Sequence, residues 1–388
     1  MTMPAALPRA TGGYVSPFYF EFDVEHYLRT GSLDAITGQV ATFTRARKGA
    51  ARDTSGNIYQ AVHSRPRIWY DDNGVPALLV EQSRTNVVLH NRNLTNAAWT
   101  KTNVTAEQSV TGVDGLTSSA TALTATAANG TVLQAITLAS SARFQTAYVR
   151  RLAGVGTINM TMDNGSTWTV ITLTAAWTRF SIPTQTLANP TVGFRIVTSG
   201  DSIAVDYVQN EDGTDATSPI LVGATAETRA QDFLTYAVGW SAQNITAYLD
   251  TTEFGTFQRT GTRLWQIGDD DSGTDDSVYI HCAAVGDVRM TGTFSGVSGT
   301  VSNATTGAVA LGNRHEIRAI IKATMTVART ISEGTEDVGT TGSLAGNAYS
   351  EALMCLTPGG PFTGATGWRR VRVVNGERTL TEMREGRW

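Results

Sequence analysis

Residues 143–152 read RFQTAYVRRL, one of several short runs in which apolar and polar residues alternate. Turn signals such as Asp163-Asn164-Gly165 separate these runs, with no helical period between them. Strands at roughly 8 to 12 residue spacing are typical of a β-sandwich, so the pattern predicts a jelly-roll-like sandwich over residues 87–230. The runs are TVLQAITL (131–138), RFQTAYVRRL (143–152), INMTM (158–162), TWTVITL (167–173), WTRFSI (177–182), VGFRIVT (192–198) and IAVDYVQNE (203–211).

A second series of runs follows and predicts a second sandwich over residues 231–388. The runs are NITAYLDT (244–251), TRLWQIGD (262–269), SVYIHCAAV (277–285), VRMTGTF (288–294), HEIRAIIKA (315–323), TMTVARTI (324–331), EALMCLT (351–357) and WRRVRVVN (368–375). Near the end, Thr379 precedes Glu382 by the spacing of a capping box, which predicts a short C-terminal helix.

The segment before the first sandwich divides into an N-terminal attachment arm (1–37) and a connector module (38–86). Aromatic residues crowd the arm from Tyr14 to Tyr27, which indicates either a docking arm or a strand that closes the following domain. Short strands are expected in the connector at 39–44, 57–62, 67–70 and 77–81. The predicted fold class is therefore all-β, with two consecutive jelly-roll-like sandwiches preceded by an arm and a connector.

Composition narrows the classes of partner. Of the 388 residues only 16% are charged, and the net charge of −4 gives no electrostatic footprint for nucleic acid or anionic membranes. The small basic run Arg45, Arg47, Lys48 and Arg52 is expected to be a solvated loop. Two cysteines, Cys282 and Cys355, are too few for a disulfide scaffold. Without a signal-like or membrane-spanning segment, the protein is expected to be made in a cytoplasm without membrane insertion.

Several segments resemble a known family. The runs ATFTRA (41–46) and PRIWYDDNGVPALLVEQSRTN (66–86) are similar to a recurrent segment of phage head and tail spike or fibre proteins. LTNAAWTKTNVT (94–105) and DGLTSSATALT (114–124) resemble the opening of a carbohydrate-binding-module-like jelly roll, and QNEDGTDATSPILV (209–222) resembles its end. The C-terminal part is more loosely similar to concanavalin-like lectin domains.

The resemblance implies a structural protein on a virion surface, made in the bacterial host cytoplasm, that binds host cell-surface saccharide for adsorption. Its arm would attach to other virion proteins of the capsid or tail. A homo-oligomer, trimeric or pentameric, is expected because weak saccharide sites gain avidity when several copies are presented together. A purely architectural decoration or adaptor protein is the alternative. A capsule depolymerase is less favoured, because the rung repeat of a long β-helix is absent from the sequence.

The sequence contains no HExxH or GxSxG motif, so the protein is predicted not to be an enzyme and to need no cofactor. None of the histidines has a neighbour that would make it a general base or a metal ligand. The histidines are His26, His63, His90, His281 and His315. The acidic run GDDDSGTDDS (268–277) offers Asp269, Asp271 and Asp275 as ligands for Ca²⁺, although a solvated hairpin loop is the simpler interpretation.

Saccharide binding requires flat aromatic rings for the apolar face of a pyranose, with polar groups nearby for its hydroxyls. Among the tryptophans considered, Trp168, Trp99 and Trp240 are predicted as saccharide contacts. Trp168 follows the Gly165-Ser166 turn and is expected to be the most exposed ring, whereas Trp177 is expected in the core. The tryptophans considered are Trp99, Trp168, Trp177, Trp240 and Trp265.

Overall fold

The computed structural model describes residues 19–385 apart from a set of gaps, most of them in the C-terminal third of the chain. The gaps lie at residues 37, 39, 214–215, 238–244, 254–261, 269–276, 285–286, 295–296, 305–313, 322–323, 332–336, 339–341, 344–352, 356–364 and 376–379. The regular secondary structure of the described residues is β-strand apart from two short helices, so the all-β prediction is confirmed.

The first sandwich consists of two five-stranded sheets, in the orders β15-β12-β17-β10-β9 and β14-β13-β16-β11-β8. Its strands are β8 (Thr100–Thr102), β9 (Val104–Val110), β10 (Ala120–Ala125), β11 (Gly130–Ala135), β12 (Ser141–Ala153), β13 (Ile158–Thr161), β14 (Thr169–Ile171), β15 (Thr178–Leu187), β16 (Thr191–Ile196) and β17 (Ser202–Asp212). Side chains from the inner faces of both sheets, among them Leu123, Val149 and Phe194, bury an apolar core between them. Alternation along the strands therefore produces the sandwich as predicted.

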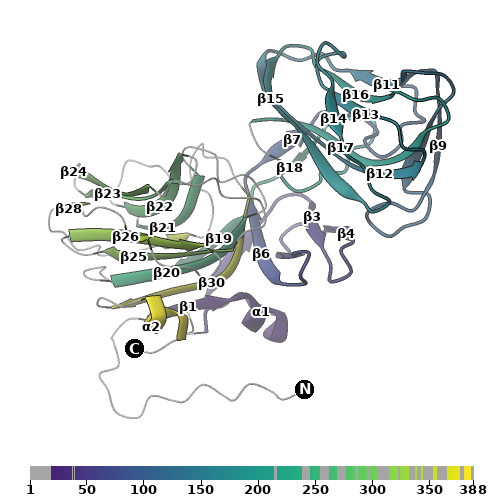
Figure 1. Cartoon of the computed structure of the whole chain (residues 1–388). Helices are drawn as coiled ribbons and strands as arrows, with labels where there is room; N and C mark the ends of the chain where they lie inside the picture. Colours follow the sequence, from purple (N-terminus) through teal and green to yellow (C-terminus); the bar gives the residue numbers. More distant parts are fainter. Residues whose placement is uncertain are drawn as a thin grey trace.

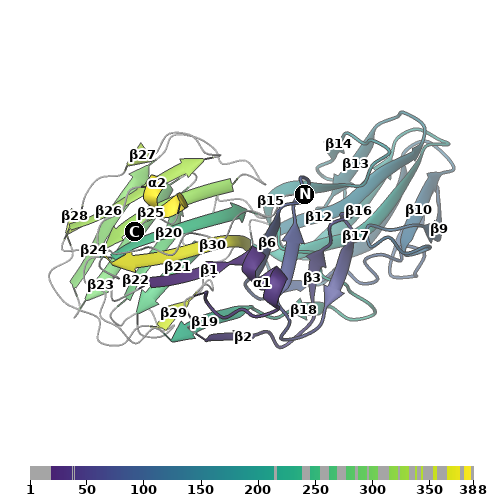
Figure 2. The same ribbon diagram turned by 90° about the horizontal axis from the view of Figure 1, so that it is seen from below.

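The C-terminal region forms a second pair of β-layers (Figures 1 and 2). The larger sheet contains β1 (Tyr19–Asp23), β3 (Gly49–Arg52), β4 (Ile58–Ala61), β5 (Arg67–Tyr70), β6 (Pro76–Glu81), β20 (Ile245–Glu253), β25 (Arg314–Ile321), β26 (Thr324–Ile331), β27 (Asp337–Val338), β28 (Gly342–Ser343) and β30 (Ala365–Asn375). The smaller sheet contains β2 (Ala41–Thr44), β19 (Phe233–Ala237), β21 (Thr262–Gly268), β22 (Ser277–Ala284), β23 (Asp287–Phe294), β24 (Val297–Ala304) and β29 (Leu353–Cys355). Both sheets therefore combine strands from the two ends of the chain.

From residue 19 onward, strands of the predicted arm and connector segments belong to the two C-terminal sheets. β1 pairs antiparallel with β30, and β6 pairs with the other end of β30, so that residues 365–368 lie beside residues 78–81. β2 pairs with β19 in the smaller sheet. Strands from both ends of the chain therefore complete one another's hydrogen bonding across the same sheet.

The first sandwich is an insertion into this C-terminal unit. The chain enters it through β7 (Arg84–Asn86) and leaves through β18 (Glu227–Arg229), and these two strands pair antiparallel. The Thr85 and Thr228 hydroxyls lie 2.7 Å apart across the ribbon. Asn86 secures the entry point, because its side chain donates to the carbonyl oxygens of Val208 and Ile220.

Five charged side chains are buried next to this ribbon, and we call them the junction cluster. They are Arg45, Arg67, Glu81, Arg229 and Asp232, each at most 1% exposed. Arg67 lies between the two carboxylates: it donates to Glu81 at 2.6 Å and also to Asp232, which Arg45 contacts at 2.9 Å. The expectation of a solvated loop is therefore wrong for Arg45, because its charge is neutralised by a carboxylate from a distant segment.

Two short helices complete the described part of the chain, and neither is long and apolar enough to cross a membrane. Helix α1 (Val24–Thr30) begins where the Asp23 side chain accepts from the Glu25 amide and ends at Gly31, whose φ of 73° is left-handed. Helix α2 (Leu380–Glu385) confirms the predicted C-terminal helix. Its Met383 packs against Tyr248 and Val374 of the larger sheet.

Candidate ligand-binding cleft

A cleft with a volume of about 580 Å³ lies where the first sandwich meets the β3 to β5 region. Figures 1 and 2 show β3 close to the sheet that contains β12, β15 and β17. The cleft is lined by Arg52, Ser55, Gly56, Asn57, Ile58, Trp69, Asp72, Gly112, Val113, Tyr148, Trp177, Thr178 and Arg179. Two modules that are separate in sequence therefore each supply one wall.

The sandwich wall is the outer face of β12 and β15. Val149 points into the core, so its neighbours Tyr148 and Arg150 point outward by the two-residue period of a strand. Tyr148 lies opposite Arg179 across the ladder, and the Arg179 guanidinium is 5.7 Å from the centre of the tyrosine ring. Trp177 precedes β15, with the Arg150 guanidinium 5.2 Å from its ring. The wall thus alternates aromatic rings with guanidinium groups.

The facing wall comes from the β3–β4 hairpin and from β5. Asp53 shapes the hairpin turn, because one of its carboxylate oxygens accepts from the amides of Ser55 (2.9 Å) and Asn57 (2.8 Å). Arg52 donates to the Tyr70 carbonyl at 3.0 Å and pairs with Asp72 at 2.7 Å. The half-buried Trp69 ring completes this wall.

Tyr207 has a strained backbone conformation and packs between the two modules that form the cleft walls. Tyr207, within β17, has a φ of 43°, which is unusual for a bulky side chain, and the β12–β17 register shifts nearby. Its ring is 3% exposed and belongs to one buried cluster with Ala50 and Ile58 of the facing module. The register shift therefore directs the Tyr207 ring away from the sandwich core and against Ala50 and Ile58 of the facing module.

Arg92 forms ion pairs next to this contact between the sandwich and the facing module. Its guanidinium donates to both carboxylate oxygens of Asp206, at 2.6 and 3.0 Å, and to Asp114 at 2.5 Å. It also lies 4.4 Å from the centre of the Tyr207 ring. Burial raises the pKa of Tyr207 to about 12, and burial likewise raises the pKa of Tyr148. Both phenols are therefore neutral hydrogen-bond donors near pH 7.

The chemistry available in the cleft is that of recognition. The half-buried Trp69, Tyr148 and Trp177 offer ring surface for apolar contact, and Asn57 and Arg179 offer amide and guanidinium donors. Among the described residues, the one carboxylate that lines the cleft belongs to Asp72, whose side chain is 90% exposed and paired with Arg52.

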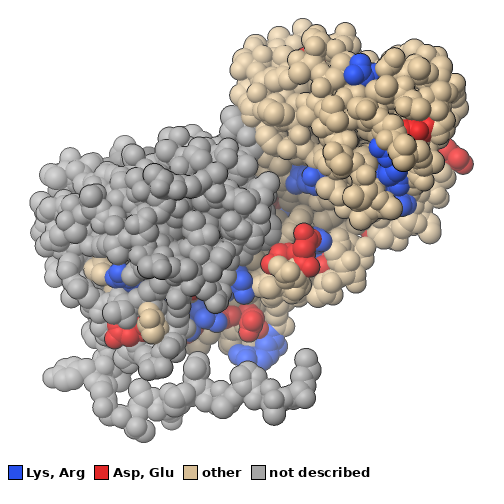
Figure 3. All heavy atoms as spheres, viewed as in Figure 1, with Lys and Arg blue, Asp and Glu red and all other residues tan. Residues whose placement is uncertain are grey.

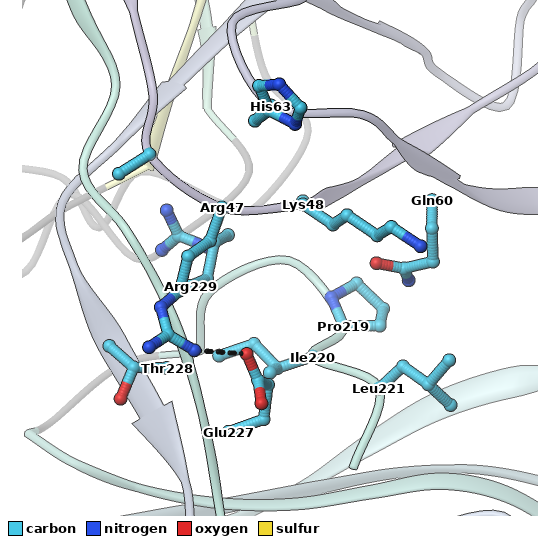
Figure 4. A pocket seen from close by; sticks show the side chains of 12 residues that line it. Arg47, Lys48, Gln60, His63, Pro219, Ile220, Leu221, Glu227, Thr228 and Arg229 are labelled. Atoms are coloured by element: carbon cyan, nitrogen blue, oxygen red, sulfur yellow. Dashed lines mark hydrogen bonds and ion pairs between the residues drawn. The ribbon is translucent and has the colours of Figure 1, made fainter.

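A second cavity, of about 350 Å³, lies on another side of the same junction (Figure 4). Its lining contains no aromatic ring other than His63, and Arg47 pairs there with Glu227 at 2.8 Å. Lys48 and Gln60 also line this cavity. In the space-filling view, the charged side chains on the visible face of the first sandwich form only small separate groups (Figure 3).

The predicted saccharide contacts are scattered. Trp99 is 1% exposed and belongs to the sandwich core, where its indole nitrogen donates to the Leu89 carbonyl at 3.2 Å, so its ring has no face for a ligand. Trp168 is partly exposed, but its ring contacts the Gly165 turn and lies 4.5 Å from the Arg195 guanidinium, outside the cleft. Trp240 lies outside the described residues.

The predicted calcium ligands Asp269, Asp271 and Asp275 also lie outside the described residues. In the part of the chain that is described, no group of three or more potential metal ligands comes together.

Sequence reasoning missed the aromatic residues of the cleft. Trp177 was expected in the core but is half-buried and lines the cleft, and Trp69 and Tyr148 were not singled out. For Tyr148 and Arg150 a signal was present, since both occupy the outward positions of an alternating strand. For Trp69 there was none, because its exposure depends on the module that faces it.

Comparison with known proteins adds no family assignment, since no protein-family model matches this chain. No curated protein matches it either.

Proposed function

We propose that the protein is a non-catalytic, saccharide-binding surface protein of a bacteriophage particle, and that the cleft between the first sandwich and the β3 to β5 region is its saccharide site. The observation that carries the proposal is the convergence of Trp69, Tyr148 and Trp177 on one cavity that also contains amide and guanidinium donors. A pyranose has an apolar face and a rim of hydroxyls, and this combination matches both.

The size of the cleft also supports the proposal. About 580 Å³ is within the usual range for small-ligand sites and is larger than the second cavity of about 350 Å³. Burial raises the pKa of Tyr148, so its hydroxyl stays protonated near pH 7 and can donate a hydrogen bond. The second cavity lacks comparable ring surface, so it is the poorer candidate for a sugar.

The particle context of the proposal rests on the resemblance to phage spike and fibre proteins. Several residues in the resembling segments belong to the junction: Arg45, Arg67 and Glu81 are members of the junction cluster, and Asn86 secures the inserted sandwich. If spike and fibre proteins attach their inserted sandwich through the same contacts, this would explain the sequence similarity of these segments. Attachment to capsid or tail and homo-oligomerisation are parts of the same proposal.

The test measures binding of the purified full-length protein to host cells with and without their surface polysaccharide, with released sugar assayed in the same tubes. We expect polysaccharide-dependent binding without released sugar. Trp177→Ala should reduce it about fivefold or more, since stacking on an aromatic ring contributes on the order of 1 kcal/mol or more. Trp177→Phe should restore part of it.

Trp168→Ala is the matched control, because this ring also lies beside an arginine but is outside the cleft. Thermal unfolding of each variant separates lost binding from lost folding. Binding that survives Trp177→Ala would move the site elsewhere, and absence of any binding would favour an architectural protein. Released sugar would contradict the non-catalytic part of the proposal.

A further inference from the structure

Two arginines on the outer face of the sandwich have no acidic partner among the described residues: Arg179, which lines the cleft, and Arg150, which lies over the cleft residue Trp177. Arg179 donates to the Thr146 hydroxyl at 3.0 Å and to the Thr217 carbonyl at 2.7 Å. The guanidinium of Arg150 lies over the Trp177 ring, and its Nε is buried without a hydrogen-bond partner. Both guanidinium groups are therefore held by neutral contacts that leave their charge uncompensated.

Arginines elsewhere near the junction differ in this respect. Arg67 is paired with Glu81, Arg92 with Asp206, and Arg47 with Glu227. Within the cleft itself, Arg52 is paired with Asp72. Arg150 and Arg179 therefore place two positive charges on the outer face of β12 and β15, since each guanidinium is always protonated.

These charges lie beside the rings that would hold a sugar. Tyr148 and Arg179 face each other across β12 and β15, and Arg150 is on the same outward face as Tyr148. An anionic group on a pyranose seated against Trp177 would therefore meet a guanidinium without displacing an existing carboxylate. Charge-assisted hydrogen bonds of this kind are about twice as strong as neutral ones.

We propose that the cleft selects acidic saccharides, in which a sugar ring carries a carboxylate or another anionic substituent that Arg150 and Arg179 bind. The inference rests on the proposed function of the cleft and adds the class of ligand. The rings contribute contact with any pyranose, whereas the two arginines distinguish a charged sugar from a neutral one.

The experiment compares binding of the full-length protein to four immobilised polymers. Polygalacturonate and carboxyl-reduced polygalacturonate differ only in the carboxylate, and dextran sulfate and dextran separate a sulfate from a neutral glucan. We expect the wild-type protein to bind polygalacturonate or dextran sulfate at least tenfold more tightly than its neutral counterpart. The preference should shrink as salt rises from about 0.05 to 0.5 M, because ions screen exposed charges.

Arg150→Gln and Arg179→Gln should each lower acidic-polymer affinity about tenfold, the loss expected for one charge-assisted hydrogen bond. Arg195→Gln is the matched control, because Arg195 lies over Trp168, which is outside the cleft, whereas Arg150 lies over Trp177, which lines it. Trp177→Ala should also weaken binding of acidic polymers, which separates the cleft from diffuse charge attraction.

The outcomes distinguish this inference from the function on which it rests. Equal binding of neutral and acidic polymers, lost in Trp177→Ala but not in the arginine variants, would overturn the acidic preference and leave saccharide binding intact. Acidic binding that is insensitive to Trp177→Ala, or equally sensitive to Arg195→Gln, would also overturn it. No binding of any polymer or of host polysaccharide would remove both proposals together.

Discussion

The interior of the first sandwich and the interior of the junction are both closed to water, yet they are built from opposite kinds of side chain. Leu123, Phe194 and Ile203 in the sandwich are apolar and at most 1% exposed. At the junction, Arg67 and Glu81 are equally buried but carry full charges. The same burial is therefore reached by apolar packing in one region and by charge pairing in the other.

Apolar packing and charge pairing determine different features of the structure. Apolar packing is non-directional, and the sandwich core draws its residues from one continuous stretch, 88–208, so the sandwich contains what its core needs. The junction cluster combines residues 45–81 with residues 229–232, and a buried charge is costly until its partner arrives. The junction cluster therefore determines how the sandwich is positioned on the C-terminal unit. This position in turn sets the separation of the two cleft walls.

The largest expected effect comes from breaking the charge pairing. Arg67→Met keeps much of the side-chain volume but leaves Glu81 and Asp232 without their shared partner. Removing one partner of a buried pair costs about 3 to 5 kcal/mol. Hydrogen exchange read by peptide mass spectrometry should show faster exchange in β5 and β6, with β10 and β16 unchanged.

The matched change in the sandwich is Leu123→Ala, which removes a fully buried apolar side chain. It should cost about 2 to 5 kcal/mol, and here β10 and β16 should exchange faster while β5 and β6 keep their protection. If both variants accelerate exchange in all four strands equally, the two regions form one cooperative unit and the comparison fails.

A fall in pH should weaken the junction, with an effect on the order of 3 kcal/mol. Burial by itself would raise the pKa of Glu81, but the charges of Arg229 and Arg67 and hydrogen bonds from Ser218 outweigh it and lower the pKa from 4.5 to about 2. Because the folded pKa is depressed, the stabilisation is complete above pH about 4.5 and is lost as the pH falls toward 2. Urea unfolding between pH 7 and pH 2.5 measures it.

Glu81→Gln is the control for the titration, because glutamine has the same shape and no ionisable proton. This variant is less stable at pH 7, but its junction stability should depend less steeply on pH below 4.5. Equal slopes in the variant and the wild-type protein would assign the acid sensitivity to other carboxylates.

The sandwich could be predicted from the sequence better than the junction, because its pattern is local whereas the junction pairs residues that are distant in the sequence. Alternation is local, and RFQTAYVRRL (143–152) indeed lies within β12. The pairing of β6 with β30 joins residues near opposite ends of the chain, and no local pattern in either strand specifies its partner. The burial of Arg45 was misjudged because its compensating carboxylate, Asp232, is distant in sequence.

The candidate site shows the same limit. A strand pattern indicates which side chains leave the core, as it does for Tyr148, but not what faces them. Trp99 and Trp168 illustrate the two failures: one ring is buried completely and the other lies outside the cleft. The shape of a cleft between two modules depends on their relative position, and here the junction cluster determines that position.

The smallest expected effect belongs to Trp168, and it tests whether the cleft alone binds saccharide. Its ring lies over Arg195, whose guanidinium also donates to the Asn159 side chain at 3.1 Å. Trp168→Ala should therefore cost about 0.5 to 1 kcal/mol of stability, the range for an exposed cation–π contact. Saccharide binding should be unchanged, because the ring is not in the cleft. Thermal unfolding and binding assays on the same sample measure both. Binding lost without any loss of stability would instead place the sugar on the sandwich's other sheet, and the seating of the sandwich would then be irrelevant to recognition.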